Sequence, residues 1–432
     1  MQALLSYDQS PPIEAPFRFF LTAPVFGVLA GMLLVWTGPN AFLSRWTPEA
    51  LALTHLVTAG FMLQVMLGAL IQVLPVVAGA NVARPLLISR FVHCAITLGA
   101  GLLAGAFLTF RPWLFIVSSL CFIVGGLLFV GAAAWAMRGI PSSGPTIGGL
   151  KISVSGLGVT VALGTAMAFG MAGWFDLPLM QLADIHLGWG FVVWGIGLLA
   201  AVAYVVVPMF QITPAYPAWL SDRFAQFSLA VTGGWTAAAI TGPDAAYLIA
   251  ALAMVGATAV FAGVTLALQR RSKRSRFDTN QYCWRGAMIC ILAAAAVWST
   301  ASAIPAVGEW TGWPILCGVL LMFGGFVSVI TGMLYKIVPF LVWLHLQNLG
   351  GGVRMTPNMK KIIDEQSMHR QMLSHFFALI LLLMAVFWPE ELAVLAGIAV
   401  AVSQAWLAWN LFSGVNVFRN HRSAILEKLA VS

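Results

Sequence analysis

The chain has 432 residues, of which 60% are hydrophobic and only 8% are charged, and its formal net charge is +8 at pH 7. Soluble domains usually contain about 25% charged residues, so this composition excludes a soluble globular protein and indicates an integral membrane protein in contact with a lipid bilayer. The basic residues lie at the ends of apolar segments and in one cluster, RRSKRSR at 270–276, which membrane topology explains better than a nucleic-acid partner does.

The first sixteen residues, MQALLSYDQSPPIEAP, are polar and carry no basic start and no small-residue cleavage site. We therefore expect no removable signal peptide. Apolar segments of about 20 residues, the length that crosses a bilayer, then follow one another along the chain. They predict an all-α membrane protein with twelve transmembrane helices, near 17–37, 49–76, 86–110, 113–137, 152–175, 182–208, 218–241, 244–269, 282–303, 312–339, 368–388 and 391–416.

The short connections between these segments differ in charge. Arginines and lysines gather on one side, and the 270–276 cluster is the largest group, whereas the other side carries mainly Asp and Glu. The positive-inside rule makes the basic side cytoplasmic. We expect a multi-pass protein of the bacterial inner membrane with both termini in the cytoplasm.

A pattern recurs along the chain with a period near 131 residues. A polar residue is followed by a proline at the end of a helix, and after a further connection by an arginine. The members are Gln72, Pro75 and Arg90, then Tyr204, Pro208 and Arg223, and finally Tyr335, Pro339 and Arg370. We interpret these as three four-helix repeats within one membrane domain, at about 1–150, 151–280 and 281–432. The alternative is chance, because proline ends helices and arginine marks the cytoplasmic side.

Two histidines and a cysteine occupy matching places in this frame. His55 lies near the outer end of the second segment, His186 follows it by 131 residues, and Cys317 follows His186 by the same interval. Imidazole and thiolate are good ligands for copper, zinc and haem iron, so His55, His186 and Cys317 are candidate metal ligands. The alternative is structural: histidine is tolerated near the membrane interface, and cysteine packs as a small apolar residue.

A second, weaker set lies toward the inner side. His93 and His375 each lie within a predicted helix and could bind a second cofactor or relay protons. The five cysteines form no CxxC or CxxCH motif, which argues against a disulfide framework and against covalently attached haem.

The twelve segments, the three arcs and the histidines of the second and sixth segments resemble the catalytic subunit I of haem-copper oxidases. The phrase THLVTAGFMLQVMLGALIQVLPV at 54–76 is closer to the shorter NnrS-like membrane proteins, which are associated with haem, copper and nitric oxide. This resemblance implies haem b, copper or both as cofactors, with His55 matching a haem ligand and His186 a copper ligand. The tenth segment has no His-x-His pair and the seventh has no His-His pair, so we do not expect a proton-pumping oxygen reductase.

The sequence thus predicts an inner-membrane haem- or copper-binding protein linked to nitric oxide or respiratory metal metabolism. If it is an enzyme, it is an oxidoreductase, and its partners could include a c-type cytochrome or the subunits of a respiratory complex. The alternatives are a cofactor-free transporter or permease on the same fold, with Gln64, Gln72, Tyr204 and Tyr335 along its path, and a non-catalytic subunit of a respiratory complex.

Overall fold

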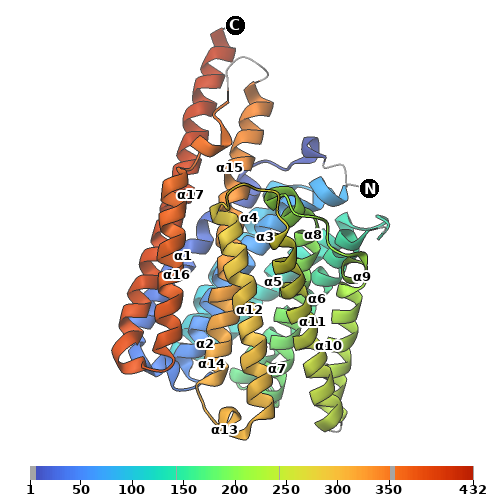
Figure 1. Cartoon of the computed structure of the whole chain (residues 1–432), viewed down its shortest axis with the longest axis vertical. Coiled ribbons are helices and arrows are strands. Elements are labelled where there is room, and N and C mark those ends of the chain that lie inside the picture. Colours follow the sequence, from blue (N-terminus) through green and yellow to red (C-terminus); the bar gives the residue numbers. More distant parts are fainter. Residues whose placement is uncertain (1–5, 143, 243, 351–355, 432) are drawn as a thin grey trace. The chain divides into compact units, whose positions relative to one another are not determined.

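The computed structural model describes residues 6–142, 144–242, 244–350 and 356–431, and within these ranges the regular elements are all helices (Figure 1). The chain forms two compact units, each composed of three stretches of sequence. Unit 1 comprises Met1–Pro11, Leu70–Ser275 and Met288–Trp313, and unit 2 comprises Pro12–Ala69, Arg276–Ala287 and Pro314–Ser432. These units do not follow the predicted repeat boundaries near 150 and 280, which stay a prediction.

Unit 1 contains most of the first half of the chain. Its elements are η1 (Tyr7–Gln9), the later part of α3 (Leu63–Ala78), α4 (Pro85–Thr109), α5 (Pro112–Ala136), α6 (Pro145–Met171), α7 (Leu179–Gly188), η4 (Trp189–Ile196), α8 (Gly197–Gln211), α9 (Ala218–Ser221), α10 (Phe224–Thr241), α11 (Asp244–Arg270), the later part of α12 (Thr279–Ala303) and α13 (Pro305–Gly308). Prolines begin α4, α5 and α6, where a missing N–H costs no helical hydrogen bond.

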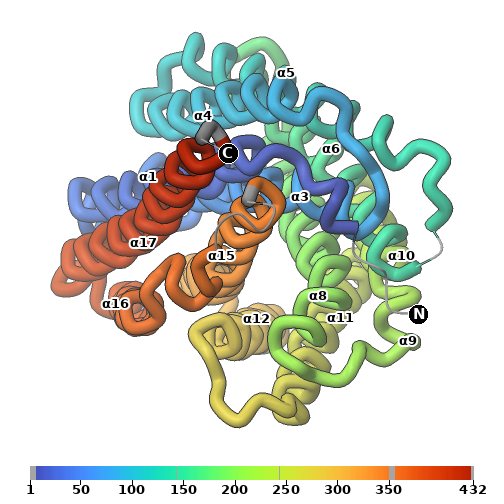
Figure 2. The backbone as a smooth tube through the Cα atoms, turned by 90° about the horizontal axis from the view of Figure 1, so that it is seen from above, coloured from blue at the N-terminus to red at the C-terminus, as the bar shows by residue number. Residues whose placement is uncertain are grey.

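Unit 2 joins the beginning of the chain to its end. It contains α1 (Glu14–Thr37), η2 (Gly38–Phe42), α2 (Pro48–His55), η3 (Leu56–Met62), the first parts of α3 and α12, most of α14 (Trp313–Gly318), η5 (Val319–Val327), α15 (Ser328–Gly350), η6 (Met359–Lys361), α16 (Glu365–Ala385) and α17 (Pro389–Val431). Helices α1 and α17 lie side by side, as the view in Figure 2 shows. Glycines permit their close approach, because a Cβ atom at Gly31 would lie 2.7 Å from the Gly397 carbonyl oxygen.

Eleven helices among the described residues are long and apolar enough to cross a membrane. They cover Glu14–Phe42, Pro48–Ala78, Pro85–Thr109, Pro112–Ala136, Pro145–Met171, Leu179–Gln211, Asp244–Arg270, Thr279–Ala303, Trp313–Leu349, Glu365–Ala385 and Pro389–Leu429. The chain is therefore an all-α, multi-pass membrane protein. The expected span at 218–241 is absent from this set because it is divided into the short α9 and the 18-residue α10, whose sequence is rich in Gly and Thr.

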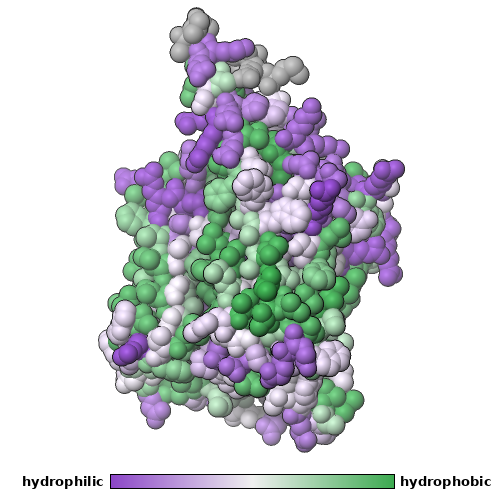
Figure 3. Space-filling model, turned by 90° about the vertical axis from the view of Figure 1, so that its left-hand side faces the viewer, coloured by the Kyte–Doolittle hydropathy of each residue, from purple (hydrophilic) through white to green (hydrophobic). Residues whose placement is uncertain are grey.

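Helix α16 shows how the spans meet lipid and core. Leu373, Phe377, Ile380 and Met384 recur at helical spacing and are 41–58% exposed. The opposite side of the helix is buried, and its Gln371 and His375 have no exposed surface. On the face drawn in Figure 3, apolar residues form a broad middle zone between more hydrophilic ends. Polar side chains inside such a zone need partners within the protein, because lipid offers none.

Candidate functional site

Three of the long apolar helices in the described residues each contain a π-helical segment in their N-terminal half. The segments are η3 between α2 and α3, η4 between α7 and α8, and η5 between α14 and α15. Helices with π turns are rare and frequently occur at functional sites, because the extra residue redirects side chains and shifts backbone hydrogen bonds. His55 directly precedes η3, His186 lies three residues before η4, and Cys317 lies two residues before η5. Each of the three candidate metal ligands therefore lies within three residues of the start of a π segment.

His55 is the last residue of α2 and belongs to unit 2. Its Nδ1 atom lies 2.8 Å from the Leu51 carbonyl oxygen. A carbonyl only accepts hydrogen bonds, so Nδ1 carries the proton and Nε2 carries the lone pair that a metal would bind. The same contact within one helical turn occurs at His345 and His421, so by itself it does not mark a ligand.

His186 is held differently, by a contact between two helices of unit 1. Its Nδ1 atom on α7 lies 3.0 Å from the Thr160 carbonyl oxygen on α6, which again places the lone pair on Nε2. A Cβ atom at Gly164, one turn beyond Thr160, would lie 2.9 Å from Cε1 of the imidazole. The ring can occupy this place because residue 164 is a glycine. A backbone carbonyl that fixes the tautomer of a histidine is the arrangement that metal-bound histidines usually show.

Cys317 is half-buried on α14 and belongs to unit 2, as His55 does. The segments that follow these two residues, η3 and η5, pack against each other. Among the described residues, no three His, Cys, Asp or Glu side chains come close enough together to hold a metal ion. His186 lies in unit 1, so the structure leaves the predicted set of His55, His186 and Cys317 as a prediction.

The second predicted set does not share one environment. His93 is half-buried on α4 of unit 1, whereas His375 lies on α16 of unit 2 and is completely buried. The His375 ring stacks on Phe323 with centroids 4.6 Å apart, and its Nε2 atom lies 2.7 Å from the Ser328 hydroxyl. Of the two, His375 has the more constrained position.

The polar residues suggested for a transport path are all buried or half-buried, but their contacts differ. Gln72 donates to the Ser10 hydroxyl at 3.0 Å, and Tyr204 packs edge-on against Tyr216. In the described part of unit 1, Oε1 of Gln72 and the hydroxyl of Tyr204 have no hydrogen-bond partner. Burial raises the pKa of the Tyr216 hydroxyl, which lies between spans, and its hydrogen bond with Thr265 opposes that change.

Tyr335 belongs to a buried network that joins three helices of unit 2. Its hydroxyl donates to Oε1 of Gln371 on α16 and accepts from Nδ2 of Asn410 on α17, at 3.0 and 2.9 Å. Nε2 of Gln371 donates to the carbonyl oxygen of Ser403 at 3.1 Å, and Ser367 donates to Oδ1 of Asn410 at 2.7 Å. Trp406 completes the group by donating to Ser367. We call Ser367, Gln371, Ser403, Asn410, Trp406 and Tyr335 the inner network.

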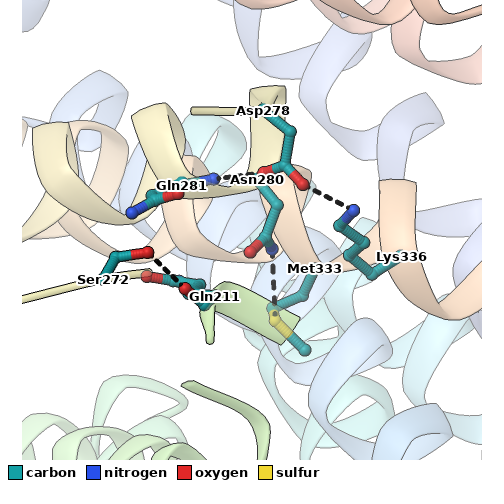
Figure 4. Close-up of polar contacts among 7 residues, drawn as sticks. All are labelled: Gln211, Ser272, Asp278, Asn280, Gln281, Met333 and Lys336. Carbon is teal, nitrogen blue, oxygen red and sulfur yellow. Dashed lines mark hydrogen bonds and ion pairs between the residues drawn. The ribbon is translucent and has the colours of Figure 1, made fainter. Parts of the chain in front are cut away.

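An ion pair joins the beginning of α12 to α15 in unit 2. Nζ of Lys336 lies 2.7 Å from Oδ2 of Asp278, and Oδ1 of the same carboxylate accepts from the backbone N–H of Gln281 (Figure 4). Nearby, Nδ2 of Asn280 contacts the sulfur of Met333 at 3.5 Å. Because the charge of Lys336 is paired with Asp278, its place in a membrane-spanning helix costs less free energy than an unpaired charge would.

Sequence reasoning missed Ser328, Thr160 and Gly164. A signal for Ser328 exists, since Ser328, Thr331 and Tyr335 recur at i, i+3 and i+7 in an apolar run and so share one side of α15. The roles of Thr160 and Gly164 had no comparable signal. Thr160 acts through its backbone carbonyl, which every residue has, and the sequence does not show which glycine lies against a histidine ring. The chain matches no family model, and no curated protein shows significant sequence similarity to it.

Proposed function

We propose that the chain is an inner-membrane protein that binds haem b, copper or both, with His55 and His186 as ligands near its periplasmic face. The observation that carries the proposal is the setting of His186, whose Nδ1–H is fixed by the Thr160 carbonyl beside Gly164 and just before a π segment. That setting presents Nε2 as a ligand atom on a rigid helix. A bound iron or copper centre would supply one-electron redox chemistry.

The recurrence of the π segments supports a threefold oxidase-like arrangement. Each lies between a candidate ligand and a helix that contains a proline, Pro75, Pro208 or Pro339. On this basis we propose that the chain has twelve spans, of which α10 is the shortest. We further propose that the spans form three four-helix repeats and that both termini lie in the cytoplasm. The role proposed for the protein is in nitric oxide or respiratory metal metabolism, as a redox protein, a sensor or an assembly factor. A c-type cytochrome or a respiratory complex is the expected partner.

The test replaces single histidines in the purified, full-length protein. His186→Ala and His55→Ala should each remove most of a haem or copper signal, measured by absorption spectroscopy and elemental analysis. His345→Ala and His421→Ala are matched controls, because both make the same Nδ1 contact with a carbonyl but do not precede a π segment. Loss of the signal in the controls, or its retention in both test variants, would contradict the proposed ligands.

A permease is the second candidate, and one observation favours it. Oε1 of Gln72 and the hydroxyl of Tyr204 are buried without a partner among the described residues, which suits polar groups along a substrate path. Under this alternative the histidine replacements would leave every absorption spectrum unchanged. Gln72→Leu and Tyr204→Phe would instead abolish solute uptake into vesicles that contain the protein.

A further inference from the structure

Two hydrogen-bonded pairs connect α15 with α16 in the core of unit 2. The first joins Ser328 to His375 at 2.7 Å, and the second joins Tyr335 to Gln371 at 3.0 Å. All four side chains are at most 4% exposed. The pairs are separated by roughly 10 Å along α15 and about 6 Å along α16, from the rise of an α-helix. The space between these two pairs is therefore bounded by polar groups on both sides.

The direction of the Ser328–His375 pair follows from a third partner. The Ser328 hydroxyl also lies 3.3 Å from the carbonyl oxygen of Phe323, five residues earlier in the π segment η5. That oxygen can only accept, so Ser328 donates to it and accepts from His375. The proton of the neutral imidazole is then on Nε2, and Nδ1 carries a lone pair. The π segment thus sets the tautomer of His375.

Two buried polar atoms in this part of unit 2 lack partners among the described residues. They are Nδ1 of His375 and the hydroxyl of Thr331. Thr331 lies between Ser328 and Tyr335 on one side of α15, so its place along the helix is between the two pairs. Other threonines of the chain, such as Thr58 and Thr160, donate to the carbonyl four residues earlier, but Thr331 does not.

Two such atoms in a lipid-embedded core cost several kcal/mol if they stay unsatisfied. The lone pair of Nδ1 needs a donor, and the Thr331 hydroxyl can both donate and accept. Water is the smallest molecule that meets both needs, and buried water typically makes about three such bonds. A metal ion fits less well, because it would need further ligands. Among the described residues, no group of three His, Cys, Asp or Glu side chains that could hold a metal ion is present.

We propose that ordered water binds between the two pairs, donates to Nδ1 of His375, and contacts the Thr331 hydroxyl. This water links the Ser328–His375 pair to Thr331, so that it bridges α15 and α16 between their two direct hydrogen-bonded pairs. The water site does not depend on the proposed haem or copper ligands, which lie on other helices.

The test uses the full-length protein in lipid nanodiscs, with isotopically labelled histidine and phenylalanine and with metal chelators present. The NMR signals of the His375 ring are assigned by their cross-peaks with Phe323 and by their absence from the spectrum of the His375→Gln variant. Water-edited solid-state NMR then measures the transfer of magnetisation from water to each imidazole. We expect a neutral His375 with its proton on Nε2 and clear transfer from water.

Variants at residue 331 provide the matched comparison. Thr331→Val should reduce the transfer to His375 at least twofold, whereas Thr331→Ser, which keeps the hydroxyl, should preserve it. This pair keeps the test valid if His375→Gln does not fold. Absence of transfer in the unmodified protein, a proton on Nδ1, or a change of the His375 signal when the chelators are omitted would each overturn the proposal. The last result would mean that a metal binds there.

Discussion

Gly164 leaves the space that the imidazole of His186 occupies, since a Cβ atom at residue 164 would come within 2.9 Å of Cε1 of the ring. Gly164→Ala should therefore displace His186 from the Thr160 carbonyl and weaken binding of haem or copper about 10- to 100-fold, the usual effect of disturbing the groups around a ligand. The bound cofactor is measured by titration and absorption spectroscopy. Gly158→Ala on the same helix is the control, because its Cβ would meet its nearest neighbour at 3.8 Å. Equal binding by both variants would contradict the role of Gly164.

Tyr335→Phe tests the inner network. Loss of the hydroxyl leaves Nδ2 of Asn410 without its acceptor and Oε1 of Gln371 without its donor. An unsatisfied buried polar group costs about 1–3 kcal/mol, so the variant should unfold at a clearly lower temperature in detergent. Tyr282→Phe serves as the control, because Tyr282 is 43% exposed. If the two variants lose the same stability, the network does not stabilise unit 2.

The contact of α1 with α17 predicts a steric effect. A Cβ atom at Gly31 would lie 2.5 Å from the Ala401 backbone nitrogen and 2.7 Å from the Gly397 carbonyl oxygen, and backbone atoms cannot move aside as a flexible side chain can. Gly31→Ala should destabilise the protein by roughly 1–3 kcal/mol. Gly101→Ala, in a helix with open space around the added atom, should be neutral or gain about 0.5–1 kcal/mol. Thermal unfolding of both variants measures the difference, and an unaffected Gly31→Ala would argue against this packing.

The interaction energy between Lys336 and Asp278 can be measured by a double-mutant cycle with Lys336→Met and Asp278→Asn. Asparagine keeps an acceptor for the Gln281 backbone N–H, so the cycle isolates the charge interaction. The two side chains are 26% and 16% exposed, and we expect a favourable coupling of about 1 kcal/mol. Strictly additive losses of stability would show that the ion pair contributes nothing.

The fold class was predictable because apolar runs of bilayer length leave the backbone few alternatives to helix. Eleven of the expected segments are present as long apolar helices, and the exception at 218–241 carries Gly and Thr that lower its hydropathy. The grouping into two units was not predictable, because it depends on long-range packing of α1 with α17 rather than on local pattern.

The candidate site was predictable in part. The spacing of His55, His186 and Cys317 singled out the three helices that contain π segments among the described residues, but the π turns themselves have no residue signature in the sequence. The partners of His186 are a carbonyl and a missing side chain, which no sequence motif records. Ser328 was overlooked because one serine in an apolar helix usually bonds only to its own backbone.

We propose that the protein binds haem or copper through His55 and His186. The most direct measurement is an absorption spectrum of the detergent-purified, full-length protein, oxidised and then reduced with dithionite, together with its iron and copper content. The proposal predicts a Soret band that shifts on reduction, or copper bound in stoichiometric amount, and loss of that signal in His186→Ala but not in His345→Ala. A protein with neither a Soret band nor bound copper would contradict the claim.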